Sequence, residues 1–326
     1  MNPPFSVIFL TTLIGMGQGL FLALYGEQVY LSLTQAGIAP FNFFFLVSAC
    51  IALCLSGLGL IASFFHLGHP ERAWRSATCW RTSWLSREVI ALPMFMLFIF
   101  IYILLSFFPG FNTSIMKVGS IAIDLSFVIG FLCSVLCVVL FVCTSMIYAC
   151  LRFLQEWRSP FTMINFMLMG CASGCILAAA LSSFMAPLLA VYYVEIAIVL
   201  TVLAAISRSL SLVRNKKLRP KSTIQSALGI NNSKIVQKSQ GAMGGSFNTR
   251  TFLHGKTKFF FKSIKWIFLT FAFLIPIIML LIELKDSDPF ILLFVLLIQY
   301  VGLIAERWYF FAEAKHPQNL YYQAIS

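Results

Sequence analysis

Charged residues are scarce in this chain, and acidic residues are the scarcest. Of its 326 residues 10% are charged, with 11 Asp and Glu against 23 Lys and Arg, whereas 60% are hydrophobic. A soluble domain carries about 25% charged residues, so the composition excludes an ordinary soluble enzyme. Apolar runs of roughly 20 residues, long enough to cross a bilayer, recur along the whole length. The sequence therefore predicts an all-α polytopic membrane protein.

Ligands for a metal centre are also missing from the apolar runs. None of the four histidines, which are His66, His69, His254 and His316, lies in the middle of a run. A haem inside the membrane would need protein ligands at that depth, most simply two histidines on facing helices. The nine cysteines contain no C-x-x-C spacing, which iron–sulfur and structural zinc sites commonly use. We expect no haem and no iron–sulfur cluster in this chain.

Eight apolar runs are predicted to cross the membrane as helices of a single integral membrane domain, residues 1–326. The first run lacks a basic leader and a small-residue cleavage site, so we interpret it as a retained span. Eight spans would place both termini and the linkers after spans 2, 4 and 6 on one face. The predicted bounds are about 5–25, 42–65, 89–107, 119–148, 163–184, 186–206, 266–284 and 289–306.

Basic residues divide unequally between the two faces. The face with the termini carries 21 Lys and Arg, 13 of them in the basic extramembrane loop 208–265, and the opposite face has only Lys117 and Lys285. The positive-inside rule therefore predicts that the basic face is cytoplasmic. Nucleic-acid-binding proteins also have such basic segments. Beside a membrane, however, the segment is more typical of contact with anionic lipid or a partner subunit, and we expect no nucleic acid.

One polar loop, between the second and third spans, gathers most of the side chains suited to chemistry. Residues 66–88 hold two of the four histidines, four arginines and two glutamates. His66 lies at the mouth of the second span, where a neutral imidazole accepts and passes on a proton near pH 7. Glu88 opens the third span, where a carboxyl can relay a proton. Either residue alone could be an ordinary interfacial residue. Together with Arg72 and Trp74, they predict a site for a small redox-active molecule.

Other polar residues in the spans are candidates as well, because ionisable groups inside a membrane are functional candidates by default. Glu195 is the best candidate for a polar interior contact or a second proton path. Asp124 is expected near the membrane edge. Glu306 is expected to form an interfacial ion pair with Arg307. Gln18, in a glycine-rich stretch of the first span, is expected either to tie two helices together or to hydrogen-bond a quinone carbonyl.

The polar loop resembles the corresponding segment of the membrane anchor subunit of dimethyl sulfoxide reductase. The similar segments are 63–74 (SFFHLGHPERAW), 82–88 (TSWLSRE), 244–250 (GGSFNTR) and 305–308 (AERW). The resemblance covers nearly the whole chain. It implies an eight-helix, haem-free anchor of a molybdopterin oxidoreductase complex in the bacterial inner membrane. Such an anchor oxidises quinol, or reduces quinone, and exchanges electrons with a four-cluster iron–sulfur subunit that serves a molybdopterin catalytic subunit.

The resemblance also implies where menaquinol or ubiquinol would bind, namely at the mouth of the second and third spans. His66 and Glu88 match the family's proton-handling residues and are expected to be catalytic. In the best-known members this loop faces the periplasm, whereas the charge count here favours the cytoplasm. The full set of residues expected to bind the quinol is His66, Gly68, Arg72, Trp74, Ser76 and Glu88.

Two other classes of protein share parts of this pattern. A secondary transporter would show broken mid-membrane helices or inverted repeats, and neither is evident here. A structural anchor without a quinone site would have the same spans but would bind no quinone. Detection of quinone in the purified complex would separate the redox function from both.

Overall fold

The structure is a computed structural model that describes residues 4–34, 41–118, 121–219, 221–236 and 258–317. This part of the chain contains eight helical segments that are long and apolar enough to span a membrane, which confirms the predicted fold. The seventh span is built from three consecutive pieces. In chain order the spans are α1 (Phe5–Thr34), α2 (Asn42–Phe64), α3 (Trp84–Phe107), α4 (Leu125–Ala149), α5 (Pro160–Met185), α6 (Pro187–Lys216), α9 (Lys258–Leu269) with η4 (Thr270–Leu274) and α10 (Ile275–Ile282), and α11 (Pro289–Glu313).

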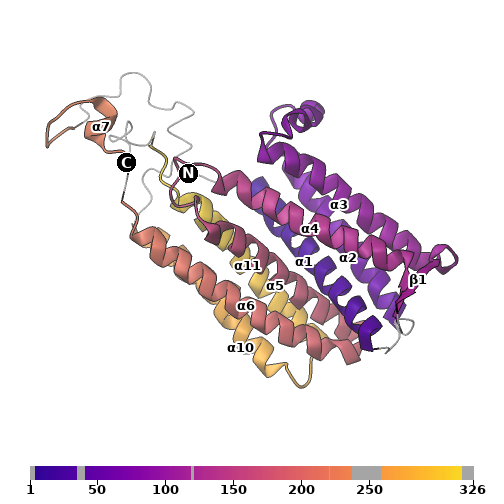
Figure 1. Cartoon of the computed structure of the whole chain (residues 1–326). Helices are drawn as coiled ribbons and strands as arrows, with labels where there is room; N and C mark the ends of the chain where they lie inside the picture. The colour runs from indigo at the N-terminus through magenta and orange to yellow at the C-terminus, as the bar shows by residue number, and fades with distance from the viewer. Residues whose placement is uncertain (1–3, 35–40, 119–120, 220, 237–257, 318–326) are drawn as a thin grey trace.

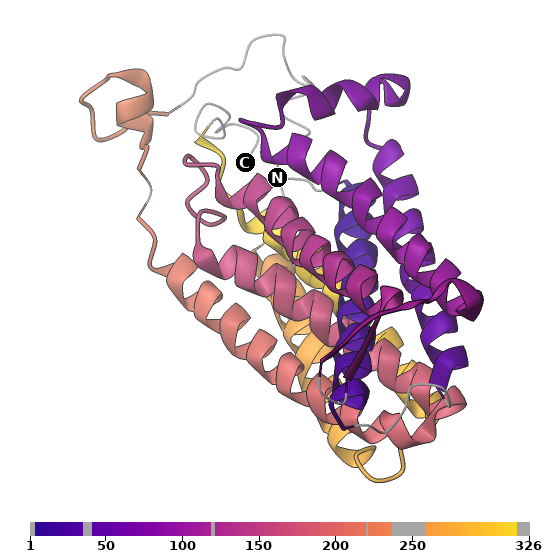
Figure 2. The ribbon, with the colours of Figure 1, turned by 45° about the vertical axis from the view of Figure 1, so that its right-hand side comes forward.

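The bundle has two ends that differ in structure. Successive spans run in opposite directions, so the start of α1, the end of α11 and the loops after α2, α4 and α6 lie at one end (Figures 1 and 2). We call it the η2 end, after the 3-10 helix η2 (Pro70–Cys79), and the short helix α7 (Ile224–Leu228) lies there too. The opposite, hairpin end carries η3 (Pro109–Phe111) and the antiparallel strands β1 (Ser114–Val118) and β2 (Ile121–Asp124).

The hairpin corrects one predicted boundary. The fourth span was expected from residue 119, but residues 121–124 form β2, and α4 begins only at Leu125. β-branched residues such as Ile123 favour extended backbone, and β2 pairs with β1 from Ser114↔Asp124 to Val118↔Ile121. Asp124 then occupies the N-cap position of α4. It is therefore at the edge of the span, as expected.

α1 and α5 form the centre of the bundle. In their most apolar stretches 67% and 72% of the residues are buried, against 28–39% in the other spans. Their backbones touch, because a Cβ atom added to Gly19 would lie 2.1 Å from the carbonyl oxygen of Gly170, and one added to Gly174 would lie 2.2 Å from the carbonyl carbon of Gly19. Only glycine permits so close a crossing. The glycine-rich stretch of the first span therefore serves helix packing.

The seventh span contains a π-helical turn, η4, next to a proline. Pro276 has no backbone N–H and cannot donate to the carbonyl of Ala272 one turn earlier. Gln299 from α11 supplies a donor instead, with its Nε2 atom 3.5 Å from the Ala272 oxygen. Backbone groups inside a membrane need such partners because no water replaces them. This bond therefore helps fix α11 against the irregular part of the span.

α6 extends further than hydropathy predicts. Its end was expected at residue 206, but the helix continues to Lys216, and the seventh span begins at Lys258 instead of residue 266. The 13 basic residues assigned to loop 208–265 are thus partly helical. Residues 237–257, which include His254 and the segment 244–250 quoted for the resemblance, lie outside the described residues.

Candidate functional site

His66 lies directly after α2, at the η2 end. α2 ends at Phe64, and the backbone N–H of His66 donates to the carbonyl of Ser63 at 3.3 Å. The side chain of His66 is exposed, yet nearby protein atoms remove part of its water. This partial desolvation lowers the pKa of the imidazole below its ordinary value, because it disfavours the charged ring. His66 is therefore neutral at pH 7 and can either accept or donate one hydrogen bond.

η2 projects from the bundle and presents the other predicted loop residues to its surroundings. None of its ten residues is buried. Gly68, just before it, is exposed, and so is Arg72, which forms a 3.7 Å ion pair with Glu71. The side chain of Trp74 is 67% exposed. Ser76 is half-buried, but its hydroxyl donates to the carbonyl of Ala73 within η2.

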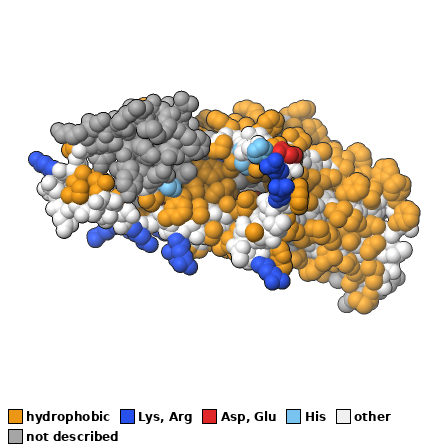
Figure 3. Space-filling model, turned by 90° about the horizontal axis from the view of Figure 1, so that it is seen from above, with side chains coloured by type: hydrophobic (Ala, Val, Ile, Leu, Met, Phe, Trp, Pro, Cys, Tyr) orange, Lys and Arg blue, Asp and Glu red, His pale blue; other side chains and the backbone are white. Residues whose placement is uncertain are grey.

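Acidic, basic and histidine side chains gather on this end of the protein, as Figure 3 shows. His69 Nδ1 and Glu71 Oε1 are 3.0 Å apart. Exposed ion pairs of this kind contribute at most about 1 kcal/mol, so they do not explain by themselves why the loop is so polar. An exposed tryptophan among arginines is instead typical of a surface that contacts lipid headgroups or a partner.

Arg87 fixes the second half of the loop onto the start of α3. Its guanidinium lies 4.2 Å from the centroid of the Trp84 ring. It also donates to the carbonyl oxygens of Trp80 at 2.9 Å and Arg81 at 2.8 Å. Ser83 caps the helix by accepting from the backbone N–H of Ser86. These contacts set where α3 begins, and they place Glu88 inside the helix, although the span was predicted only from residue 89.

Glu88 points from α3 into the bundle. Its carboxylate accepts a 2.5 Å hydrogen bond from the hydroxyl of Thr144 on α4. The two residues lie in a narrow crevice between α1, α3, α4 and α5, whose other walls include Gln18, Phe141 and Phe166. A carboxylate with a single donor in these apolar surroundings keeps acceptor capacity for a further partner. It can therefore hold or pass on a proton at this end of the membrane.

Gln18 ties helices together. Its Nε2 atom donates to the carbonyl of Cys137 on α4 at 2.9 Å, and the Cys137 thiol lies 3.4 Å from the carbonyl of Gln18. The first of its two expected roles is confirmed. Gln18 and Glu88 also line the same crevice. The structure thus brings Gln18, Glu88 and Thr144 together.

The structure does not join Glu88 to His66. Among the described residues no hydrogen bond or ion pair links the two side chains, although α2, which ends just before His66, packs against α3, which carries Glu88. Glu88 faces the crevice, whereas His66, Arg72 and Trp74 face outward. The predicted quinol site therefore has an inner part at Glu88 and an outer part in the loop, and the roles of both stay predictions.

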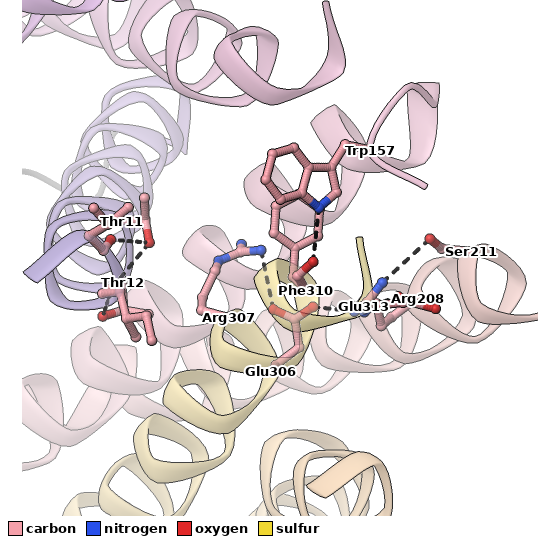
Figure 4. A network of polar contacts seen from close by, with 11 residues as sticks. Thr11, Thr12, Trp157, Arg208, Ser211, Glu306, Arg307, Phe310 and Glu313 are labelled. Atoms are coloured by element: carbon pink, nitrogen blue, oxygen red, sulfur yellow. Dashed lines mark hydrogen bonds and ion pairs between the residues drawn. The ribbon is translucent and has the colours of Figure 1, made fainter. Parts of the chain in front are cut away.

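Glu306 and Arg307 form an ion pair, which confirms that part of the prediction. Both residues are buried within the bundle, and Glu306 lies between two arginines (Figure 4). Arg208 Nε is 2.7 Å from Glu306 Oε1, and Arg307 Nη1 is 3.2 Å from Glu306 Oε2. Arg307 also lies over the ring of Phe166, 3.6 Å from its centroid. Two cations around one carboxylate offset part of the cost of burying all three.

Glu195 does not make the interior contact that was expected of it. Its side chain is exposed on α6, and Tyr193, two residues earlier, is the one that is buried. Residues two apart on a helix point to nearly opposite sides, so only one of them can face the bundle. Glu195 is therefore not a candidate for an internal proton path.

Three further polar residues make contacts or have a burial that the sequence did not predict. Thr144 lies in an apolar run, and the sequence does not indicate that it bonds to Glu88. Arg208 was counted as a loop charge, but it is only 1% exposed. Glu27 is buried in α1, whose end was predicted two residues before it. In the sequence, the only indication that Glu27 could be important was its position as an acidic residue just beyond a predicted span.

Potential metal ligands are scattered. In the part of the chain that the structure describes, no three His, Cys, Asp or Glu side chains gather as a metal site would require. The expectation that this chain holds no haem and no iron–sulfur cluster stays a prediction.

Comparison with known proteins agrees with the resemblance of the loop. A family model described as the DMSO reductase anchor subunit matches residues 1–322. A sulfite dehydrogenase subunit of Allochromatium vinosum is 46% identical over 326 residues, and the match covers 100% of both chains. Together with the eight membrane spans, these findings show that the chain belongs to the family of DMSO reductase anchor subunits, which are the membrane subunits of molybdoenzymes.

Proposed function

We propose that this chain is the quinone-reactive anchor of a bacterial inner-membrane complex that oxidises sulfite and reduces quinone. The similarity to a sulfite dehydrogenase subunit supports this direction of electron flow. The electrons would come from a molybdopterin catalytic subunit through an iron–sulfur subunit, and the same site would oxidise quinol if the complex ran in reverse. The observation that carries the proposal is the Glu88 carboxyl, which faces a crevice at the membrane edge with one fixed donor, Thr144.

Quinone reduction needs two electrons and two protons, and this chain would provide the protons. Glu88, at the inner part of the site, donates one proton to a quinone oxygen and is protonated again from the η2 end. His66, at the outer part, donates a hydrogen bond to the second oxygen and passes on the other proton. Arg72 favours negative charge that develops on the ring oxygens, and Trp74 offers a flat apolar surface for the ring. Gly68 and Ser76 shape the loop around it.

The test uses the intact complex with sulfite as the reductant and decylubiquinone as the acceptor. Glu88→Gln keeps the shape of the side chain but removes its ionisable proton, and His66→Gln removes the second proton relay. General acid–base groups contribute roughly 100-fold or more to a rate, so we expect losses of that order in quinone reduction. Glu71→Gln, a change in an exposed loop glutamate, is the matched control and should keep the rate.

A second measurement separates chemistry from assembly. Sulfite oxidation with a water-soluble dye acceptor reports on the partner subunits alone and should be the same in all variants. If Glu88→Gln and His66→Gln both reduce decylubiquinone at the wild-type rate, the chain is a structural anchor and the proposal is wrong.

A further inference from the structure

A second groove lies in the half of the bundle toward the hairpin end, away from η2. It is formed by the second half of α1, the middle of α5 and the first half of α6, which Figure 1 shows side by side. The groove has a volume of about 490 Å³ and is open to the surroundings on one side. Gly26 lies along it, and a Cβ atom added there would meet no atom within 4 Å. The floor of the groove on α1 is therefore not filled by protein.

One wall of the groove carries a buried acid, and one of its carboxyl oxygens has no hydrogen-bond partner among the described residues. Glu27 lines it and is only 6% exposed. Its Oε1 atom is shielded and, within the described residues, has no hydrogen-bond partner. Burial of a carboxyl group without a donor costs several kcal/mol, so such groups in membrane proteins are normally matched by another polar group. The missing partner is a hydrogen-bond donor.

The rest of the groove indicates what kind of molecule carries that donor. Its wall is mainly apolar, and two tyrosines, Tyr30 and Tyr192, contribute their rings with centroids 6.0 Å apart. Both rings are about half exposed, at 47% and 46%. Aromatic pairs of this kind favour a flat ring as a neighbour. The ligand should therefore combine an aromatic ring, a hydroxyl and an apolar tail.

We propose that this groove is a second binding site for quinol, with a quinol hydroxyl donating to Glu27 and the ring next to Tyr30 and Tyr192. The proposed electron transfer takes place at the η2 end, next to the loop with His66. This groove lies toward the opposite end of the bundle, so it holds quinol without oxidising it. The presence of a binding site is inferred from the geometry around Glu27 alone, whereas the absence of quinol oxidation there rests on the function proposed for His66 and Glu88.

Cys171 provides a reporter for occupancy, because it lines the same groove and is partly accessible. The experiment measures the alkylation rate of Cys171 in the purified complex, with and without decylubiquinol, by mass spectrometry of its peptide. Cys54 on α2 is exposed outside the groove and serves as the internal reference. We expect decylubiquinol to slow alkylation of Cys171 roughly 5-fold or more, and to leave Cys54 unchanged.

Two variants should remove this protection. Gly26→Leu fills the open floor of the groove, and leucine is a better helix former than glycine, so the fold should be retained. Glu27→Gln replaces one carboxyl oxygen with an amide NH₂ group and should weaken decylubiquinol binding roughly 10-fold, which is about the net worth of one hydrogen bond. Glu195→Gln, an exposed glutamate on α6 next to the groove, is the matched control and should keep the protection.

Three outcomes would overturn the proposal. One is no protection of Cys171 by decylubiquinol, and another is equal protection in wild type and Glu27→Gln. The third is protection by phosphatidylethanolamine vesicles alone, which would assign the groove to a phospholipid headgroup. Failure at the first site is recognised separately, since His66→Gln should abolish quinone reduction and leave the protection of Cys171 as in wild type.

Discussion

At the scale of single residues, the function proposed for this chain depends on polar side chains that have few partners in apolar surroundings. Glu88 has one donor, Thr144, and the buried Glu306 is shared by Arg208 and Arg307. The sequence shows which residues are ionisable, but it does not show their partners. Glu88 was recognised through its motif, whereas Thr144 and Arg208 were not, because each pair joins helices distant in the chain.

The bond between Thr144 and Glu88 can be tested by removing the hydroxyl alone. Thr144→Val keeps the shape of the side chain and leaves Glu88 without its donor. Hydrogen bonds to charged groups are worth about 1.5–3 kcal/mol, so we expect roughly 10-fold slower quinone reduction in an assembled complex. Thr201→Val is the matched control, because Thr201 is also buried but bonds to Ala197 within its own helix. Equal rates in the two variants would mean that Thr144 does not position Glu88.

His66 should make the reaction depend on pH below the ordinary imidazole range. Desolvation lowers the pKa of His66 from 6.5, so the ring stays neutral at pH 7 and becomes charged only in more acidic solution. The imidazolium is the proton donor, so quinone reduction should speed up as the pH falls through the lowered pKa. Quinol oxidation needs the neutral ring and should slow over the same interval. Rate profiles in both directions test this, and His66→Gln should lose both dependences.

At the scale of helices, the apolar runs predicted the number of spans but not all of their ends. The charge of Arg208 lowers the local hydropathy, so the predicted span ended before this residue. In the structure the carboxylate of Glu306 pairs with Arg208, and α6 continues to Lys216. The hairpin before α4 was missed because β-branched residues are as apolar as a membrane helix requires. The ends of helices depend on such distant partners, whereas the spans depend only on local composition.

The close crossing of α1 and α5 predicts a sharp difference between two identical substitutions. A Cβ atom at Gly174 would lie 2.2 Å from backbone atoms of α1, whereas one at Gly57 on α2 would lie 3.8 Å from the end of Met96. Gly174→Ala should therefore lower the free energy of unfolding by about 1–3 kcal/mol or more. Gly57→Ala should be neutral or raise it by up to about 1 kcal/mol. Thermal unfolding of the purified complex in detergent provides the measurement, and similar shifts in the two variants would contradict the crossing.

At the scale of the whole molecule, the charges of the η2 end predict which side of the membrane this end faces. All three loops that connect spans at this end carry basic residues. The last residue of α6, Lys216, is exposed, and so are Lys217 and Arg219 just after it. Arg208 is buried and paired, so it does not contribute to this surface. Removing it from the count leaves 20 Lys and Arg against two, since the original division was 21 to 2. The asymmetry therefore persists after the structural correction.

The positive-inside rule then predicts that the η2 end, with His66 and Glu88, faces the cytoplasm. Since α11 ends there, a fluorescent protein that matures only in the cytoplasm should be bright when it is fused after Ser326. Alkaline phosphatase at the same position, which is active only in the periplasm, should be inactive. A fusion inserted after Asp286, between α10 and α11 at the hairpin end, should give the reverse pattern. The proposed partner subunits would have to reach the proposed quinone site, so this result would place them in the cytoplasm and would require protons for quinone reduction to come from that side. An active phosphatase after Ser326 would move the site and its partners to the periplasm, and the exposed arginines of η2 would then act in docking of the partners rather than in membrane orientation.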